Sequence, residues 1–145
     1  MRTHSATLHI PAPPEQVWRV LVDFPSYGRW NSAIPEAAGP LAAGHRLRLR
    51  LHLGGGARPF RPTVVAVHPG KEFILAARLV HRRLLHASHA FRLEPDNGGT
   101  RFTQAWELTG VCAALAWPKF REGLPAFEEM NRDLAREVGR RGTGA

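Results

Sequence analysis

The chain has 145 residues, of which 43% are hydrophobic, so it is long enough for one domain with a real core and too short for two ordinary ones. This composition excludes a disordered chain, and no apolar run approaches the about 20 residues that a membrane-spanning helix needs. The net charge of +8 admits anionic partners, but the basic residues are spread along the chain, which favours a solvated arginine-rich exterior.

The N-terminal segment differs from a secretory signal, because its residues alternate instead of forming an unbroken apolar core. Cys112 is the only cysteine, which excludes an internal disulfide. We expect a cytoplasmic protein with one domain over residues 1–145 and an ordered core over residues 3–140.

The chain opens with a predicted strand over residues 3–10, where alternate residues share one face. Pro13 and Pro14 then suit the first turn of a short amphipathic helix, and a second proline-led turn leads to another short helix that reaches Trp30. Trp18 lies on the apolar face of the first helix and is expected in the core. Trp30 lies beside an asparagine in a loop-like setting, which fits the core and a cavity mouth equally well.

Five further strands are predicted after a connection over residues 36–44. The clearest runs from His45 to Leu53, where leucines alternate with arginines and histidines and define one buried and one exposed face. Three glycines then form a turn that lacks the ending of a phosphate-binding loop. The remaining predicted strands cover residues 60–68, 72–80, 84–94 and 100–109, and Pro62 indicates an edge or a bulge in the first of them.

The turn over residues 95–99 predicts a hairpin between the last two strands. One register gathers the apolar residues of both strands on one face, and it pairs Leu93 with Phe102, Phe91 with Gln104, His89 with Trp106, and Ala87 with Leu108. In this register Glu107 faces the opposite, polar side. A slip of one residue would exchange the faces and bring Glu107 inside, beside His86.

The chain closes with a helix in which apolar residues recur at helical spacing after Pro118. These residues are Phe120, Leu124, Phe127, Met130, Leu134 and Val138. Pro125 lies inside this pattern, and because an interior proline breaks a backbone hydrogen bond, we expect either a kink near residues 121–125 or a helix that begins there. The order β-αα-β₅-α predicts an α+β domain with an antiparallel sheet.

This order of elements, with several short motifs, resembles the START-like superfamily, also called SRPBCC, which includes the polyketide cyclase/dehydrase and birch-pollen-allergen-like proteins. The motifs are the opening I-P-A-P-P-E-Q-V-W-R-V-L-V-D-F, the Y-G-R-W-N after it, Gly39–Leu47, G-G-T-R-F-T-Q before a strand that ends in E-L-T-G, and L-P-A-F-E-E-M-N-R-D-L in the closing helix. Together they are specific for the fold rather than for an activity. The chain departs from the family pattern at Ser32, where a proline is frequent, and at Pro125.

The resemblance implies a helix-grip fold, in which a curved antiparallel sheet of about six strands wraps around a long C-terminal helix, with two short helices after the first strand. It also implies a hydrophobic cavity between the sheet and that helix, where family members bind lipids, sterols, polyketides or other apolar molecules. By position, the residues that would line it are Tyr27, Trp30, Asn31, Leu49, Leu51, Phe73, Leu75, His89, Phe91, Phe102, Gln104, Trp106, Phe120, Leu124, Phe127 and Met130.

No recognisable nucleophile motif is present, so no residue is predicted as catalytic. The candidates for proton transfer are His89, on the apolar face, and Glu107, if the register slips. We expect no metal site, because His86 and His89 lie on opposite faces of a strand and His81 lies near a turn. We expect no cofactor.

The favoured hypothesis is a binding module for a hydrophobic small molecule, since an apolar lining with a few polar groups is typical of ligand sites. One alternative is a cyclase or dehydratase-type lyase that uses the same cavity. Another is an adaptor that contacts a membrane or a protein through Arg46, Arg48, Arg50, Arg92 and Arg101. We expect neither a transmembrane segment nor a nucleic-acid partner, and the sequence specifies neither the ligand nor the oligomeric state.

Overall fold

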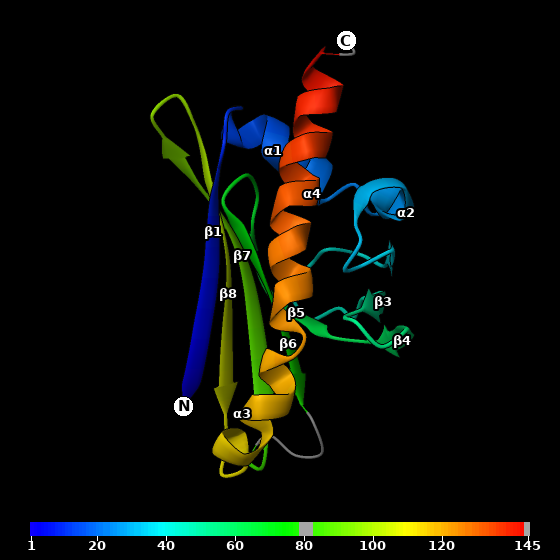
Figure 1. Ribbon diagram of the computed structural model, residues 1–145, viewed down its shortest axis with the longest axis vertical. Coiled ribbons are helices and arrows are strands. Elements are labelled where there is room, and N and C mark those ends of the chain that lie inside the picture. Colours follow the sequence, from blue (N-terminus) through cyan, green and yellow to red (C-terminus); the bar gives the residue numbers. More distant parts are fainter. Residues whose placement is uncertain (79–82, 144–145) are drawn as a thin grey trace.

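The computed structural model describes residues 1–78 and 83–143 and is shown in Figure 1. The strands are β1 (Arg2–Ile10), β2 (Glu36–Ala38), β3 (Arg48–His52), β4 (Ala57–Phe60), β5 (Thr63–His68), β6 (Glu72–Arg78), β7 (His86–Asp96) and β8 (Gly99–Thr109). The helices are α1 (Pro14–Leu21), the 3₁₀ turn η1 (Phe24–Ser26), α2 (Tyr27–Trp30), α3 (Ala113–Arg121) and α4 (Leu124–Thr143). The end of the predicted strand over residues 72–80, and His81, lie outside the described residues.

The larger sheet has five antiparallel strands in the order β1-β8-β7-β6-β5. At its centre is the β7–β8 hairpin, whose turn residues Asn97 and Gly98 have positive φ angles of 49° and 80°, as a two-residue hairpin turn requires. This turn fixes the register, and Leu93 lies opposite Phe102. The register predicted from the sequence, with its apolar face, is therefore confirmed.

A second, smaller sheet contains β2, β3 and β4 in that order. The predicted alternation from His45 to Leu53 is confirmed, since Leu47 and Leu49 are buried while the arginines beside them are exposed. The structure differs from the expected single sheet in detail, because β2 lies in the segment predicted as a connection and residues 60–68 divide into β4 and β5. Pro62 explains the division, since proline has no backbone N–H to donate to a ladder.

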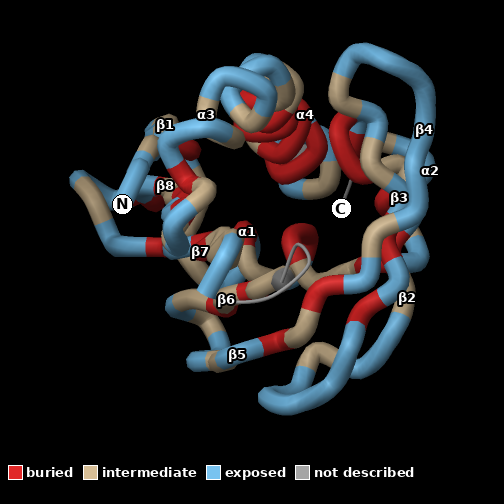
Figure 2. Tube along the Cα trace, turned by 90° about the horizontal axis from the view of Figure 1, so that it is seen from below, coloured by how far each residue is buried: buried red, intermediate tan, exposed pale blue. Residues whose placement is uncertain are grey.

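The larger sheet curves around α4, and the view along the helix in Figure 2 shows β1, β8 and β7 to its left, β6 and β5 below it, and the smaller sheet to its right. The apolar stripe predicted for the closing helix faces the strands and is buried at Leu124, Phe127, Met130, Leu134 and Val138. The α+β class and the helix-grip arrangement are thus confirmed. We call the end of the molecule with α3, the start of β7 and the N-terminus the α3 end, and the end with the β7–β8 turn the hairpin end (Figure 1).

The closing helix begins at Leu124, which confirms the second of the two alternatives for Pro125. Pro125 lies in the first turn, where the missing N–H leaves no intrahelical hydrogen bond unmade. The separate helix α3 begins earlier than the sequence predicted and contains Pro118. Between the helices, a Cβ added to Gly123 would lie 3.1 Å from Leu53 Cδ1, so the smaller sheet closely approaches the α3–α4 junction.

Polar contacts fasten the short helices to the hairpin-end half of α4. The Ser32 N–H donates to the carboxylate of Asp133 (2.9 Å), and Arg136 donates to the other oxygen of the same carboxylate (2.6 Å). Arg141 donates to Asp23, which directly precedes η1 (3.0 Å). The first short helices are therefore fixed against the last element of the chain.

Among the described residues, no helix combines the length and the apolar character needed to cross a bilayer.

Candidate functional site

Toward the hairpin end, the interior between the larger sheet and α4 is a closely packed core. Leu93, Phe102 and Leu134 are 4%, 0% and 0% exposed. The α1 helix covers this half, and the Trp18 ring lies 6.0 Å from the ring of Phe73. Side chains therefore exclude water from this half of the interior.

Toward the α3 end, the inward-facing residues are incompletely covered. The register of β6 and β7 turns Ala77, Ala87 and His89 inward, yet all three remain only half-buried. The same partial burial is found in the smaller sheet and α3, at Leu51, Leu53, Phe60, Trp117 and Phe120. Water can therefore reach inward-facing apolar side chains at this end of the molecule.

A chain of hydrogen bonds lies between these two halves. Gln104 is 0% exposed, and its Nε2 donates to the carbonyl oxygen of Phe127 (3.0 Å) and to Asn131 Oδ1 (2.7 Å). Asn131 Nδ2 donates in turn to the backbone oxygen of Ala6 (3.4 Å). On the other side, Gln104 Oε1 lies 2.8 Å from His89 Nε2. The chain thus joins β7, β8, α4 and β1.

This geometry determines which nitrogen of His89 carries the proton. Because Gln104 Nε2 faces a carbonyl oxygen, the amide oxygen is the atom that faces His89. An amide oxygen only accepts, so neutral His89 is protonated at Nε2 and its Nδ1 is an acceptor. Nδ1 forms no hydrogen bond with the described residues and is not fully buried. It therefore offers one acceptor to the half-buried region.

Aromatic rings pack against His89. Their centroids lie 4.1 Å (Phe91), 4.7 Å (Trp106) and 5.0 Å (Phe127) from that of the imidazole. Burial lowers the pKa of His89 from 6.5 to about 3, and the hydrogen bond with Gln104 opposes this only in part. The ring is therefore neutral at physiological pH, and its Nδ1 suits a ligand hydroxyl rather than a carboxylate.

We expect acid to destabilise the protein through His89. In the unfolded chain His89 takes up a proton as the pH falls below about 6.5, whereas in the folded chain it does so only near pH 3. Between these values the unfolded state binds more protons, so the free energy of unfolding falls as the pH falls, by up to about 1.4 kcal/mol per pH unit. This contribution is complete above pH 6.5. Urea unfolding measured between pH 7 and pH 4 checks it.

The variant His89→Phe is the control, because it keeps an aromatic ring and removes the titrating group. Its free energy of unfolding should depend less on pH over this range than that of the unchanged protein. Long-range ¹H–¹⁵N NMR should also show the His89 proton on Nε2 at pH 7. A proton on Nδ1, or the same pH dependence in both proteins, would contradict the assignment.

Tyr27 and Asn31, two of the predicted lining residues, are buried in local contacts. Tyr27 is 2% exposed, and its hydroxyl donates to a backbone carbonyl of α1. Asn31 is 4% exposed, and its Oδ1 accepts from the N–H groups of Ala33 (3.1 Å) and Ile34 (2.8 Å), which shapes the turn after α2. Trp30 is partly buried against the core, and its ring lies 5.0 Å from that of Tyr27. Structural contacts thus occupy the Tyr27 hydroxyl and the Asn31 amide oxygen, while Asn31 Nδ2 is buried without a hydrogen-bond partner among the described residues.

The other predicted lining residues differ in burial. The buried ones are Leu49, Phe73, Leu75, Phe91, Phe102, Gln104, Trp106, Leu124, Phe127 and Met130. The half-buried ones are Leu51, His89 and Phe120. Contact of these residues with a ligand stays a prediction, and the half-buried members are those that water reaches in the structure.

Asn131, which completes the polar chain, is not among the residues predicted from the sequence. It lies four residues after Phe127 and three before Leu134, so helical spacing already places it on the inward face of the closing helix. A buried amide on an apolar face needs partners, and Gln104 on the apolar face of the last strand is the natural one. Two amides on facing apolar surfaces, Asn131 and Gln104, were therefore the signal in the sequence that predicts this contact.

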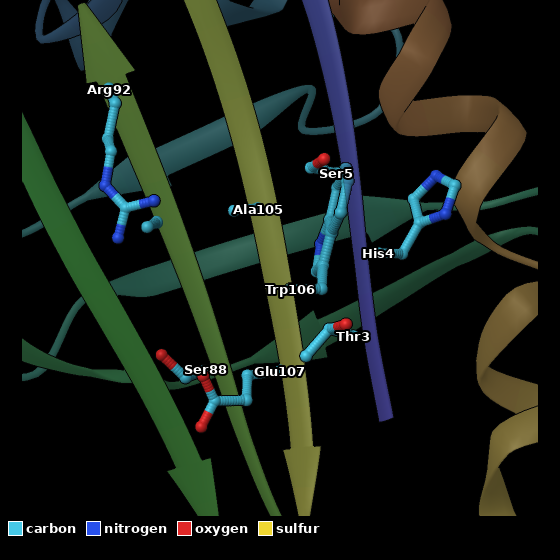
Figure 3. A pocket seen from close by; sticks show the side chains of 9 residues that line it. Thr3, His4, Ser5, Ser88, Arg92, Ala105, Trp106 and Glu107 are labelled. Carbon is cyan, nitrogen blue, oxygen red and sulfur yellow. The ribbon is translucent and has the colours of Figure 1, made fainter. Parts of the chain in front are cut away.

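Glu107 faces away from the interior, as the predicted register requires. It is exposed and lines a hollow of about 400 Å³ on the outer face of β1, β8 and β7. Figure 3 shows it beside Ser88, with Arg92 farther along the hollow, whereas His4 points toward the helix. Glu107 and His89 therefore lie on opposite faces of the sheet and cannot act on one substrate.

The arginines of the hypothetical adaptor surface do not share one sheet. Three of them lie on or next to β3, where a hollow of about 200 Å³ opens on the smaller sheet. Arg92 and Arg101 lie on the larger sheet near carboxylates: Arg92 Nε is 3.0 Å from Glu72, and Arg101 Nε is 3.9 Å from Asp96. The two groups belong to different sheets, and both are partly neutralised, since Arg50 Nε also lies 3.4 Å from Glu36.

Sequence comparison connects the chain with one family. A family model described as polyketide cyclase / dehydrase and lipid transport matches residues 1–140. No curated protein matches the chain in sequence.

Solved structures share the fold over almost the whole chain. A protein from Mesorhizobium loti is 25% identical with a TM-score of 0.70, and the match covers 96% of this chain and 98% of that one. The Zhui aromatase/cyclase from Streptomyces is 16% identical with a TM-score of 0.68, covering 97% and 94%. Ara h 8.0201 is 13% identical with a TM-score of 0.64, covering 94% and 97%. At 16% and 13% identity, the last two similarities indicate a common fold and nothing about activity.

Proposed function

The chain belongs to the polyketide cyclase / dehydrase and lipid transport family, and on this premise we propose that it binds a hydrophobic small molecule with a hydroxyl group at the α3 end of its interior. Members of the family typically bind hydrophobic ligands. The observation that carries the proposal is that inward-facing Ala77, Ala87 and His89 are only half-buried and that His89 Nδ1 is an acceptor without a partner among the described residues. An apolar lining with few polar groups is the common composition of a ligand site.

The aromatic side chains beside His89 favour a flat ligand. The imidazole is nearly parallel to Phe91, with 24° between the planes, while Phe127 meets it edge-on at 81°. Of these rings the imidazole is only half-buried, so it offers the surface on which a ligand ring can pack. We therefore take a phenol-like molecule as the simplest ligand, with its ring against the apolar residues and its O–H directed to Nδ1.

Binding without chemistry agrees better with these residues than a cyclase or dehydratase reaction. His89 and Gln104 meet, but Gln104 does not titrate, and a histidine with a pKa of about 3 is a poor general base at neutral pH. Glu107 lies on the outer face, and the Tyr27 hydroxyl is already bonded to the backbone. The proposed role of this site is therefore recognition.

The proposal is tested by comparing 2-naphthol with 2-methoxynaphthalene in isothermal titration calorimetry. The first should bind about fivefold to tenfold more tightly, because only its O–H can donate to Nδ1 and a neutral hydrogen bond contributes about 1 kcal/mol. The variant Ala87→Leu should weaken both ligands by filling the half-buried region. Ala105→Leu is the matched control, since Ala105 lines the hollow on the outer face.

Two results would contradict the proposal in different ways. If neither naphthalene bound, or if Ala87→Leu and Ala105→Leu had equal effects, the interior would not be the ligand site. If both ligands bound equally tightly, the location of the site would be supported. The proposed recognition of a hydroxyl by His89 Nδ1 would be contradicted.

A further inference from the structure

Large apolar side chains are exposed at the α3 end. Met1, Val111 and Leu115 are 81%, 81% and 84% exposed, and Leu84 is 40% exposed. Among the described residues, one other large hydrophobic side chain is exposed: Val65, at 52%, which lies on β5 and not at the α3 end. Exposed apolar residues that gather in one place indicate an interaction surface, whereas single ones need no explanation.

These side chains come from three segments that the fold brings together. The β1–β8 register sets Arg2 opposite Leu108, so Met1 lies at the end of β8 that leads to Val111. The Val111 N–H donates to the backbone oxygen of Arg83 (3.0 Å), which brings the segment before β7 against the start of α3. One helical turn after Val111, on α3, comes Leu115. We name Met1, Leu84, Val111 and Leu115 the apolar tip.

Basic residues adjoin the apolar tip. Arg2 and Arg83 each directly neighbour one of its members in the chain, and Lys119 lies one helical turn after Leu115. Arg121 follows at the end of α3. The nearby carboxylate of Glu122 lies 3.1 Å from Lys119, so the charge of Lys119 is partly balanced. Positive charge next to exposed apolar side chains complements a surface whose outer layer is anionic and whose deeper layer is apolar.

We propose that the apolar tip docks the protein on the surface of a bilayer that contains anionic lipids. Apolar side chains that enter the boundary between headgroups and acyl chains gain free energy from burial, and each nearby Lys or Arg adds about 1 kcal/mol on an anionic leaflet. A second copy of the chain is a poorer occupant, because four side chains supply little of the about 800 Å² per partner of a standard interface. Figure 1 shows the N-terminus and α3 together at this end of the molecule.

The docking surface and the proposed ligand site lie at the same end of the molecule. The half-buried residues Trp117 and Phe120 belong to α3, which also carries Leu115. A hydrophobic molecule leaving the bilayer would therefore have a short path to the interior. The docking proposal does not depend on that function and is tested without a small-molecule ligand.

The experiment is flotation of the protein with vesicles of phosphatidylcholine alone and of phosphatidylcholine with phosphatidylglycerol. Binding should be strong only to the second kind and should weaken as salt is added. The variants Val111→Asp and Leu115→Asp should each lower the fraction bound at least about fivefold, because a carboxylate is repelled by the lipid headgroups. Leu115→Asp should keep the fold, since an acidic residue in the first turn of a helix is favourable.

Val65→Asp is the matched control, with the same change at an exposed apolar residue on β5. It should float with the vesicles as the unchanged protein does. Equal losses in Val65→Asp and the tip variants, or no flotation of the unchanged protein, would overturn the proposal. So would a shift from dimer to monomer in the tip variants by light scattering without any loss of vesicle binding, because that result assigns the apolar tip to self-association.

Discussion

Replacing Gln104 with leucine should lower the free energy of unfolding by about 3–5 kcal/mol, although leucine is apolar and of similar size. The amide is 0% exposed and makes hydrogen bonds to His89, Phe127 and Asn131. Leucine would leave the imidazole N–H of His89 and the amide oxygen of Asn131 without this partner, and each such group costs about 1–3 kcal/mol, whereas the Phe127 carbonyl keeps its hydrogen bond within α4. Equilibrium unfolding in urea measures the loss.

The neighbouring variant Thr103→Val controls for the position on β8. Thr103 faces the other side of the sheet, and its hydroxyl lies 3.1 Å from that of Thr7 in an exposed hydrogen bond, so its loss should cost less than about 1 kcal/mol. The double variant Gln104→Leu with His89→Phe should recover part of the stability, because it removes one of the unpaired groups. Equal stability of Gln104→Leu and the unchanged protein would show that the polar chain is dispensable.

The variant Gly110→Ala should be destabilised by about 3 kcal/mol or more, and more than the same change at Gly54. Both glycines have a φ of +106°, so the backbone strain of an alanine is alike at the two sites, about 1–2 kcal/mol. They differ in their surroundings. A Cβ on Gly110 would lie 2.5 Å from the backbone oxygen of Leu84, whereas nothing lies within 4 Å of a Cβ on Gly54.

Thermal and urea unfolding of the two variants would therefore separate strain from steric clash. The difference between them measures how tightly the segment at Leu84 is held against the end of β8. Two variants of equal stability would mean that the backbone at Leu84 can move away from Gly110 without loss, and that the contact between these segments is loose.

The sequence predicted the centre of the fold well because two independent patterns agreed there. Alternation of apolar and polar residues in β7 and β8 selects one face, and the turn at Asn97 and Gly98 selects the register. The division into two sheets had no such support. A strand of three residues such as β2 is too short for a periodic signal, and Pro62 indicated an irregularity without indicating that the chain changes sheets there.

The candidate site was predictable only in part, for a physical reason. The register placed His89 and Gln104 on adjacent strands, but their hydrogen bond, and with it the tautomer, depends on where the Phe127 carbonyl lies relative to the sheet. The distance between helix and sheet follows from packing and has no local signal in the sequence. The local contacts of Tyr27 and Asn31 could not be predicted, because aromatic and amide side chains serve equally well in a binding site and in a buried turn.

The pairing of β1 with β8 has a consequence for co-translational folding. β1 occupies an edge of the larger sheet beside β8, so during synthesis it has no neighbour in the sheet until residues 99–109 have also emerged. Until then the nascent chain contains an unpaired strand, which is open to aggregation and to chaperone binding. Because Asn131 completes the polar chain to Ala6, the interior can close only after residue 131 has emerged.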